Sequence, residues 1–250
     1  MELTFNTNDE ADTSAERSVI IGGKTCNPSS IIEILSPLLT QERKLKIASV
    51  VDQRTMSSAV VCENVDDIGN VYAVMRTAEN LGFQNVHMVR GEKRQRCSRI
   101  SQGCDKWLDV YRWQFTTDCM DHLKKSGYKI IATSCEKNAR PLTEIDFTVP
   151  VAMVFGNEKD GVSKEMLACA DETCWIPAVG HSQSFNISVA AAILLYNAFL
   201  KRVEKFGCQG DLSDTEREFL MARHYIKSVK GAEGIIGNHI LKNSPFHSLH

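Results

Sequence analysis

Two short loops carry most of the residues in this chain that could do chemistry. The first runs from Gly156 to Gly161 and follows the apolar segment Val149–Phe155. Its two glycines allow backbone N–H groups to approach a ligand closely. The second loop, residues 180–186, is small and polar, follows an apolar segment that ends at Pro177, and opens a long apolar helix. Ligands bind in α/β sheets where two loops leave neighbouring strand ends and each opens a helix, so we expect a ligand site here.

Three segments, in this order, resemble the motifs of the SpoU-type RNA 2′-O-ribose methyltransferases of the SPOUT superfamily. The resemblance extends from about residue 45 to residue 205, and the flanking segments are similar to those of members that act on guanosine 18 of tRNA. The matching residues are Asn70, Arg76 and Leu81-Gly82-Phe83 for the first motif, 156–161 with Ile176-Pro177 for the second, and Ser184-Phe185-Asn186-Ile187-Ser188 for the third.

This resemblance implies an S-adenosylmethionine (AdoMet) cofactor, an RNA ribose 2′-hydroxyl as acceptor and no metal. The residues that it implies for catalysis are Asn70, Arg76, Glu158, Ser184 and Asn186. The residues that it implies for cofactor binding are Thr133, Gly156, Gly161, Ile176 and Phe185. Phe185 stands where the family usually has Leu, and we expect it to reshape one wall of the cofactor site.

Arg76 has two possible roles. The resemblance implies that it helps to remove the hydroxyl proton, but an arginine is normally protonated and would need help from the substrate phosphate. The other role is to position that phosphate and stabilise the developing alkoxide. Asn70 lies nearly two helical turns earlier and is expected to orient Arg76 or the acceptor ribose. We expect Glu158, Ser184 and Asn186 to hold Arg76 and the loop, although Ser184 and Asn186 alone could be helix N-caps.

Composition is that of a globular protein with one sizeable α/β core, at 250 residues with 43% hydrophobic and 24% charged residues. The net charge of −2 does not indicate a nucleic-acid partner. Five of the ten residues 90–99 are basic, however, and such a local field attracts RNA phosphates. The alternative for this cluster is a solvated charged face. The expected RNA-binding residues are Arg43, Lys44, Arg54, Arg90, Lys93, Arg94, Arg96 and Arg99.

The nine cysteines are scattered without a C-x-x-C pair, which is typical of small buried hydrophobic residues in a reducing compartment. The longest apolar run, Ile187–Leu200, is shorter than a membrane span and is interrupted by polar residues. The N-terminal segment is acidic, unlike a transit peptide. We therefore expect a cytoplasmic protein with no membrane partner.

From Ser58 onward, expected strands and expected helices alternate along the sequence. This alternation predicts an α/β fold with a mostly parallel sheet of about six strands and helices on both faces. We expect a disordered acidic tail (1–28), a helical extension (29–56), the methyltransferase domain (57–206) and a C-terminal helical extension (207–250). The helix after Asn186 is apolar nearly all round, so it is either central to the core or also contacts a second subunit. The resemblance implies a homodimer through this helix and a C-terminal trefoil knot.

The predicted function is therefore AdoMet-dependent methylation of a ribose 2′-hydroxyl, with guanosine 18 of tRNA as the implied target. Ribosomal RNA is the alternative substrate, and a catalytically silent RNA-binding protein of the same fold is the alternative from another class. A Rossmann enzyme is disfavoured because no G-x-G-x-x-G opens the first βα unit. The segment Gly22-Gly23-Lys24-Thr25 has the end of a P-loop pattern, but Ser18 stands where that pattern needs Gly. The loop 156–161 is not a P-loop either, because Val162 stands where the pattern needs Lys.

Overall fold

The computed structural model describes the chain except for residues 1–2, 7–17, 91–102, 104, 137–138 and 243–250. The described residues form two compact units. One unit comprises residues 54–211, and the other combines residues 1–53 with 212–250. Both terminal segments therefore belong to one unit, whereas the sequence suggested two separate extensions.

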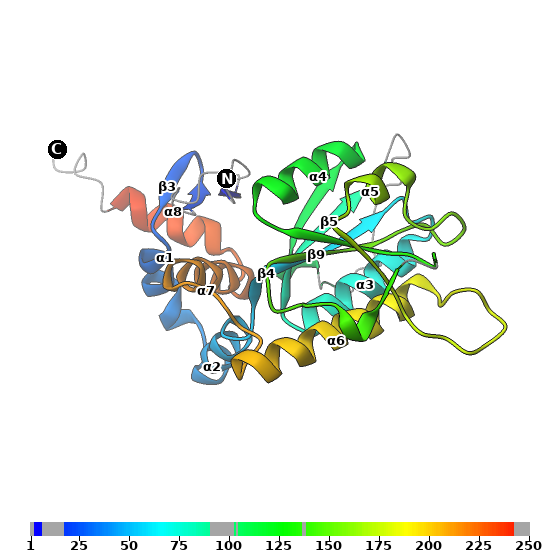
Figure 1. The fold of residues 1–250 in the computed structure, drawn as a ribbon. Coiled ribbons are helices and arrows are strands. Elements are labelled where there is room, and N and C mark those ends of the chain that lie inside the picture. The colour runs from blue at the N-terminus through cyan, green and yellow to red at the C-terminus, as the bar shows by residue number, and fades with distance from the viewer. Residues whose placement is uncertain (1–2, 7–17, 91–102, 104, 137–138, 243–250) are drawn as a thin grey trace. The chain divides into compact units, whose positions relative to one another are not determined.

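A seven-stranded sheet forms the centre of the 54–211 unit (Figure 1). The strands are β4 (Thr55–Glu63), β5 (Phe83–Val89), β6 (Asp109–Trp113), β7 (Lys129–Thr133), β8 (Arg140–Pro141), β9 (Val151–Phe155) and β10 (Glu172–Trp175). They lie in the order β6-β5-β4-β9-β7-β10-β8, and neighbouring strands are parallel. The predicted α/β fold is confirmed. The additional strand is β8, whose two residues are too few to produce a hydrophobic pattern.

Helices cover both faces of this sheet (Figure 1). They are α3 (Ile68–Asn80) and α6 (Ile187–Phe206) on one face, and α4 (Thr116–Lys125) and α5 (Lys164–Cys169) on the other, with short 3₁₀ turns at Asp105–Trp107 and Leu142–Glu144. Val60 and Cys62 of β4 pack in the core on the α3 side, and Ala59 and Val61 pack on the α4 side. Residues 59–62 of this strand are all apolar because both of its faces are buried. The trefoil knot stays a prediction.

Three helices of this unit that follow strands have an N-cap residue whose side chain accepts a backbone hydrogen bond. Asp67 accepts a hydrogen bond from the Gly69 N–H at 2.7 Å and starts α3. Ser163 starts α5, and Asn186 starts α6. Each such cap contributes about 1 kcal/mol, so the starting point of each helix is well defined. This matters because predicted site residues lie within α3 and in the loops that precede α5 and α6.

Arg54 lies at the start of this unit and is buried, with 1% of its surface exposed. Its guanidinium donates to the Glu79 carboxylate at 2.6 Å and to the Glu79 carbonyl at 3.1 Å. The prediction that Arg54 binds RNA is therefore wrong. The helix expected to present it to solvent, α2 (Gln41–Val51), ends three residues earlier, so Arg54 belongs to the sheet unit instead.

The second unit contains a three-stranded antiparallel sheet and several helices. Its elements are β1 (Leu3–Asn6), β2 (Ser18–Ile21), β3 (Lys24–Cys26), α1 (Pro28–Leu35), a 3₁₀ turn at Ser36–Leu38, α2, α7 (Asp214–Ser228) and α8 (Ala232–Lys242). The expectation of a disordered tail over residues 1–28 is wrong for these strands. Gly22 and Gly23 have φ values of 57° and 77° and join β2 to β3 as a two-residue hairpin turn.

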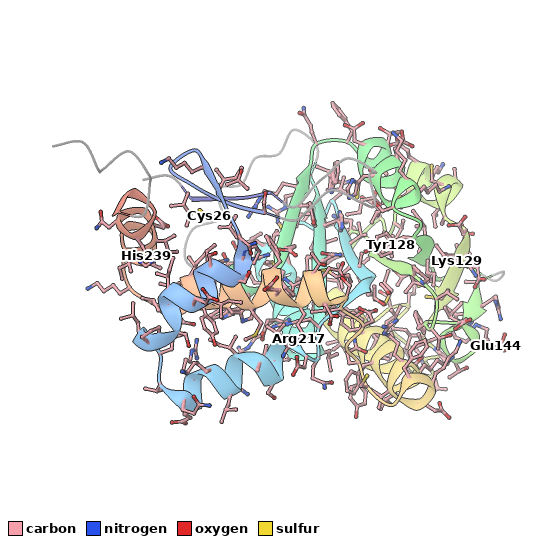
Figure 2. The ribbon with its side chains drawn as sticks, turned by 90° about the vertical axis from the view of Figure 1, so that its left-hand side faces the viewer. Cys26, Tyr128, Lys129, Glu144, Arg217 and His239 are labelled. Atoms are coloured by element: carbon pink, nitrogen blue, oxygen red, sulfur yellow. The ribbon has the colours of Figure 1, made fainter. Side chains whose placement is uncertain are left out.

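Helix α7 brings the terminal segments of the second unit together. It packs against α1 and α2, and Phe219 and Leu220 are fully buried. Arg217, labelled in Figure 2, donates from Nε to Asp52 at 2.6 Å. No helix in the described part of the chain is long and apolar enough to cross a membrane.

Candidate active site

The predicted cofactor-binding residues Thr133, Gly156 and Ile176 lie at the carboxyl ends of adjacent strands. Thr133 ends β7, Gly156 follows β9 and Ile176 follows β10, and these strands are neighbours in the order β9-β7-β10. The Thr133 hydroxyl also donates to the carbonyl of Val154 at 3.0 Å, which ties the end of β7 to β9. The carboxyl edge of a parallel sheet is where α/β proteins bind their ligands.

The loop from Gly156 to Gly161 is a closed turn. The backbone groups of Asn157 and Gly161 exchange hydrogen bonds of 2.8 and 2.9 Å. A Cβ on Gly156 would lie 2.2 Å from backbone atoms of Gly161 and Val162, so only glycine fits there. Gly161 has a φ of 70°, in the left-handed region that favours glycine. Both glycines are therefore needed by the turn itself.

A line of hydrogen bonds joins three of the predicted catalytic residues. The Asn70 amide donates to Glu158 Oε1 at 2.9 Å, and the Asn186 amide donates to Asn70 Oδ1 at 3.3 Å. Asn186 Oδ1 also accepts from the Ser188 N–H at 2.9 Å and so caps α6. Asn186 is therefore more than a helix cap. One residue from each of the three sequence motifs is brought into this line, although Asn70 is 88 positions from Glu158 and 116 positions from Asn186 in the sequence.

Glu158 occupies one end of this line as an acceptor. Partial desolvation raises its pKa, but hydrogen bonds from the Asn70 side chain and from the backbone N–H groups of Glu158, Asp66 and Asp67 outweigh that effect. The pKa of Glu158 therefore lies below its ordinary value. A carboxylate held in its ionised form by several donors is suited to orienting Asn70 and is poorly suited to accepting a proton.

Arg76 lies on α3, nearly two helical turns after Asn70, and its side chain is exposed. Within the described residues, no hydrogen bond or ion pair is made by its guanidinium. We expected Glu158, Ser184 and Asn186 to hold Arg76, but Glu158 and Asn186 bond to Asn70 instead. Ser184 is exposed on its loop. Arg76 is thus available to a substrate.

Comparisons with known proteins agree with this arrangement. Residues 57–196 match the family model described as the SpoU rRNA Methylase family. The chain belongs to this family. The resemblance inferred from the sequence motifs is therefore confirmed.

Similar SpoU-family proteins include a tRNA (guanosine(18)-2′-O)-methyltransferase of Borreliella burgdorferi, 32% identical over 205 residues that cover 82% of this chain and 94% of that protein. The protein of the same name from Escherichia coli strain K12 is 36% identical over 161 residues, which cover 64% of this chain and 70% of that protein. A solved structure, the A. aeolicus TrmH/SpoU tRNA modifying enzyme, superimposes with a TM-score of 0.68 and 30% identity, covering 76% of this chain and 98% of that one.

The connection between β4 and α3 holds the 156–161 loop of this SpoU-family chain, and sequence reasoning missed this role. Asn157 donates from its amide to the Asn64 carbonyl at 2.8 Å, and the Asp66 N–H donates to Glu158 Oε2 at 3.2 Å. Asn64 has a φ of 52°, which is unusual for a residue other than glycine. A signal was present in the sequence, because acidic Glu63 directly follows the apolar run of residues 59–62.

The predicted RNA-binding residues have different surroundings. Arg43 and Lys44 lie on α2 in the terminal unit, where Arg43 donates to the Ser228 hydroxyl and Lys44 to the Ser36 hydroxyl. Arg90 directly follows β5, and its N–H donates to the Trp113 carbonyl at 3.1 Å. Lys93, Arg94, Arg96 and Arg99 lie outside the described residues.

Proposed function

We propose that this SpoU-family chain transfers the methyl group of AdoMet to the ribose 2′-hydroxyl of guanosine 18 in tRNA. The observation that carries the proposal is the hydrogen-bonded line from Glu158 through Asn70 to Asn186, with the free guanidinium of Arg76 on the same helix as Asn70. The names of the relatives that match most of the chain support the choice of substrate.

The residues at the carboxyl edge of the sheet fit an AdoMet site. Gly156, Thr133 and Ile176 follow one another in that order along this edge, and the closed 156–161 loop presents backbone groups there. Phe185 is 40% exposed and supplies apolar surface that a bound cofactor would cover. When bound, AdoMet supplies an electrophilic methyl group on a sulfonium ion. The chain contributes the binding site, the orientation of the acceptor and the exclusion of water.

Arg76 and Asn70 act on the acceptor side. We assign Arg76 to positioning the acceptor phosphate and stabilising the developing alkoxide, because arginine side chains stay protonated and bind phosphate through paired N–H donors. Asn70 is held from both sides, by Glu158 and Asn186, so its orientation is set before substrate binds. Preorganised polar groups of this kind need no rearrangement during the reaction.

A second copy of the chain is proposed to cover the outer face of α6. Val189, Tyr196 and Leu200 on this face are 46%, 53% and 46% exposed, although the opposite face of α6 is buried in the core. Three large apolar side chains exposed on one face of a helix are typical of an interface. We therefore propose a homodimer through α6. We also place the protein in the cytoplasm, because the seven described cysteines are all free thiols.

RNA affinity is proposed to come from phosphate contacts by Arg43, Lys44, Arg90 and the basic residues of segment 93–99. Neutralising phosphates releases counterions, so affinity should fall with salt by a log–log slope of about −0.7 to −0.9 per contact. Replacing Arg94 and Arg96 together should flatten this slope by roughly one to two units and weaken all RNAs alike. A binding constant that is independent of salt would show that this cluster is only a solvated face.

One experiment tests the proposed reaction. AdoMet binding is measured by calorimetry, and 2′-O-methyl groups are then mapped in tRNA and ribosomal RNA incubated with the protein and AdoMet. We expect methylation at guanosine 18 of folded tRNA. Methylation of a ribosomal RNA hairpin in place of tRNA would favour the alternative substrate. RNA binding without AdoMet binding or methyl incorporation would indicate a catalytically silent RNA-binding protein.

A further inference from the structure

Glu63 is a buried carboxylate at the carboxyl end of β4, with 1% of its surface exposed. Oε2 accepts from the Ser163 N–H at 2.9 Å, and Oε1 accepts from the Ser163 hydroxyl at 2.6 Å. Oε1 also accepts from the Thr116 hydroxyl, at the start of α4, at 2.8 Å. A buried carboxylate is unfavourable unless donors satisfy it, so these three bonds hold Glu63, Ser163 and Thr116 in one arrangement.

Ser163 connects this carboxylate to the 156–161 loop. It comes two residues after Gly161, and its hydroxyl accepts from the Met166 N–H at 3.1 Å and so caps α5. The loop has little freedom between its ends, because Gly156 already touches the backbone of Gly161 and of the next residue. A displacement of Ser163 would therefore be transmitted to the loop.

The first part of the same loop is attached to residues that directly follow Glu63. Asn157 bonds to the Asn64 carbonyl, and Glu158 accepts from the Asp66 N–H. The loop is thus anchored at both ends to one short stretch of chain, residues 63–66. Of these anchors, Glu63 is the buried one, and it provides two bonds to Ser163.

We propose that Glu63 is a positioning residue that, through Ser163, holds the 156–161 loop in the conformation that binds AdoMet. The proposal rests on the proposed function, since it deepens the account of the same cofactor site. Glu63 does not touch the reacting atoms. Its effect should therefore appear in the binding of AdoMet, and much less in the turnover of the saturated enzyme.

Substituting Glu63→Gln retains the shape of the side chain but replaces one acceptor oxygen with an amide donor. If the amide faces the Ser163 N–H, that bond is lost. If it faces the hydroxyls of Ser163 and Thr116, both hydroxyls have to turn from donors into acceptors. In either orientation the bonds to an ionised carboxylate are replaced by weaker neutral ones or lost. Ser163→Ala removes the hydroxyl bond from the loop side. Thr116→Val is the matched control, because it removes a bond to the same carboxylate oxygen from α4, away from the loop.

The test uses the full chain and measures AdoMet binding by calorimetry, thermal unfolding, and KM and kcat for methylation of tRNA. We expect Glu63→Gln and Ser163→Ala to weaken AdoMet binding and raise its KM about tenfold, with kcat within about threefold of wild type. Thr116→Val should lower the unfolding temperature by a similar amount without changing AdoMet affinity. If Glu63→Gln does not fold, Ser163→Ala decides the question.

The proposal is overturned if all three variants lose AdoMet affinity in proportion to their loss of thermal stability, since Glu63 would then serve folding alone. It is also overturned if Ser163→Ala binds AdoMet as wild type does. A wild-type chain that binds no AdoMet would instead refute the proposed function. The two failures are therefore distinguishable in the same titration.

Discussion

Gly156 provides a sharp test of the cofactor loop. A Cβ at this position would lie 2.2 Å from the carbonyl carbon and oxygen of Gly161 and the nitrogen of Val162. Real Cβ contacts essentially never fall below 3.0 Å, so Gly156→Ala must displace the loop backbone by at least the difference, 3.0 minus 2.2, or 0.8 Å. The atoms in the way belong to the backbone, so no side chain can rotate to make room.

The expected magnitude follows from the bonds that this displacement breaks. The paired backbone bonds between Asn157 and Gly161, 2.8 and 2.9 Å long, would be lost or strained. Each is worth about 0.5–1.5 kcal/mol, and overpacking adds about 1–3 kcal/mol. Together these effects make the binding conformation of the loop less favourable by about 3 kcal/mol. AdoMet binding has to supply this free energy, so its affinity would fall by roughly 100-fold or more.

Alanine substitutions at two further glycines distinguish the effect of steric overlap from the effect of backbone strain. Gly161 and Gly127 have φ values of 70° and 81°, and a Cβ on either would meet open space. Alanine should therefore lower stability by about 1 kcal/mol at both positions. Only Gly161→Ala, within the loop, should also weaken AdoMet binding, whereas Gly127→Ala, after α4, should not.

The assay is calorimetric titration of AdoMet into the three variants, with thermal unfolding recorded for each. We expect AdoMet affinity to decrease in the order Gly127→Ala, Gly161→Ala, Gly156→Ala. Binding by Gly156→Ala within threefold of wild type would refute the argument that this loop forms the cofactor site. An equal loss of affinity in Gly127→Ala would show that the effect is general destabilisation.

Three other predictions follow from the site and from α6. Arg76→Ala should reduce methyl transfer by about 100-fold or more and leave AdoMet affinity within a few-fold, since no described residue of the cofactor edge bonds to its guanidinium; a folded variant that cannot bind AdoMet would contradict this division. Leu200→Glu should convert a dimer to a monomer in light scattering, and a wild-type monomer at micromolar concentration would exclude the interface. The pKa of Glu158 is lowered in the folded chain, so its stabilising effect is present above the ordinary value of 4.5 and is lost as the pH falls through the folded pKa. The difference in unfolding temperature between wild type and Glu158→Gln should therefore be constant from about pH 6 to 8 and shrink below about pH 4.5; a difference that grows on acidification would show the reverse shift.

The central sheet could be predicted from the sequence because its strands are buried on both faces. Val151–Phe155 is apolar throughout, and helix α3 begins after a capping Asp67 where the sequence changes period. The terminal unit was harder to predict. Its strands have three or four residues each, too short for a convincing alternation, and α8 contains Gly234 and Gly237, which weaken any helix prediction. The one local signal is Gly22-Gly23, which in sequence resembles the end of a phosphate-binding loop and in the structure forms the hairpin turn between β2 and β3.

The residues of the candidate site could be predicted from the sequence, but the hydrogen bonds between them could not. Resemblance to the motifs selected Asn70, Glu158 and Asn186, and the structure joins these residues by hydrogen bonds. Their bonding partners depend on the register of β4 against β9, in which Cys62 lies opposite Phe155, and sequence spacing carries no information on that register. Acidic Glu63 stands out in the sequence, but for the same reason its partner Ser163, 100 positions away, could not be identified from the sequence.

The hydrogen bond between Asn70 and Glu158 connects the proposed cofactor site with the proposed acceptor site. Glu158 belongs to the loop assigned to the cofactor, and Asn70 belongs to the helix that presents Arg76 to the acceptor. A change in the loop on AdoMet binding must therefore alter the orientation of Asn70, and RNA bound at α3 must affect the loop to the same extent, because coupling between two ligands is reciprocal. A hydrogen bond to a charged group contributes about 1.5–3 kcal/mol, and solvent exposure of Glu158 reduces that value. Coupling through this bond alone thus cannot exceed roughly 10- to 100-fold, so each substrate should bind measurably in the absence of the other.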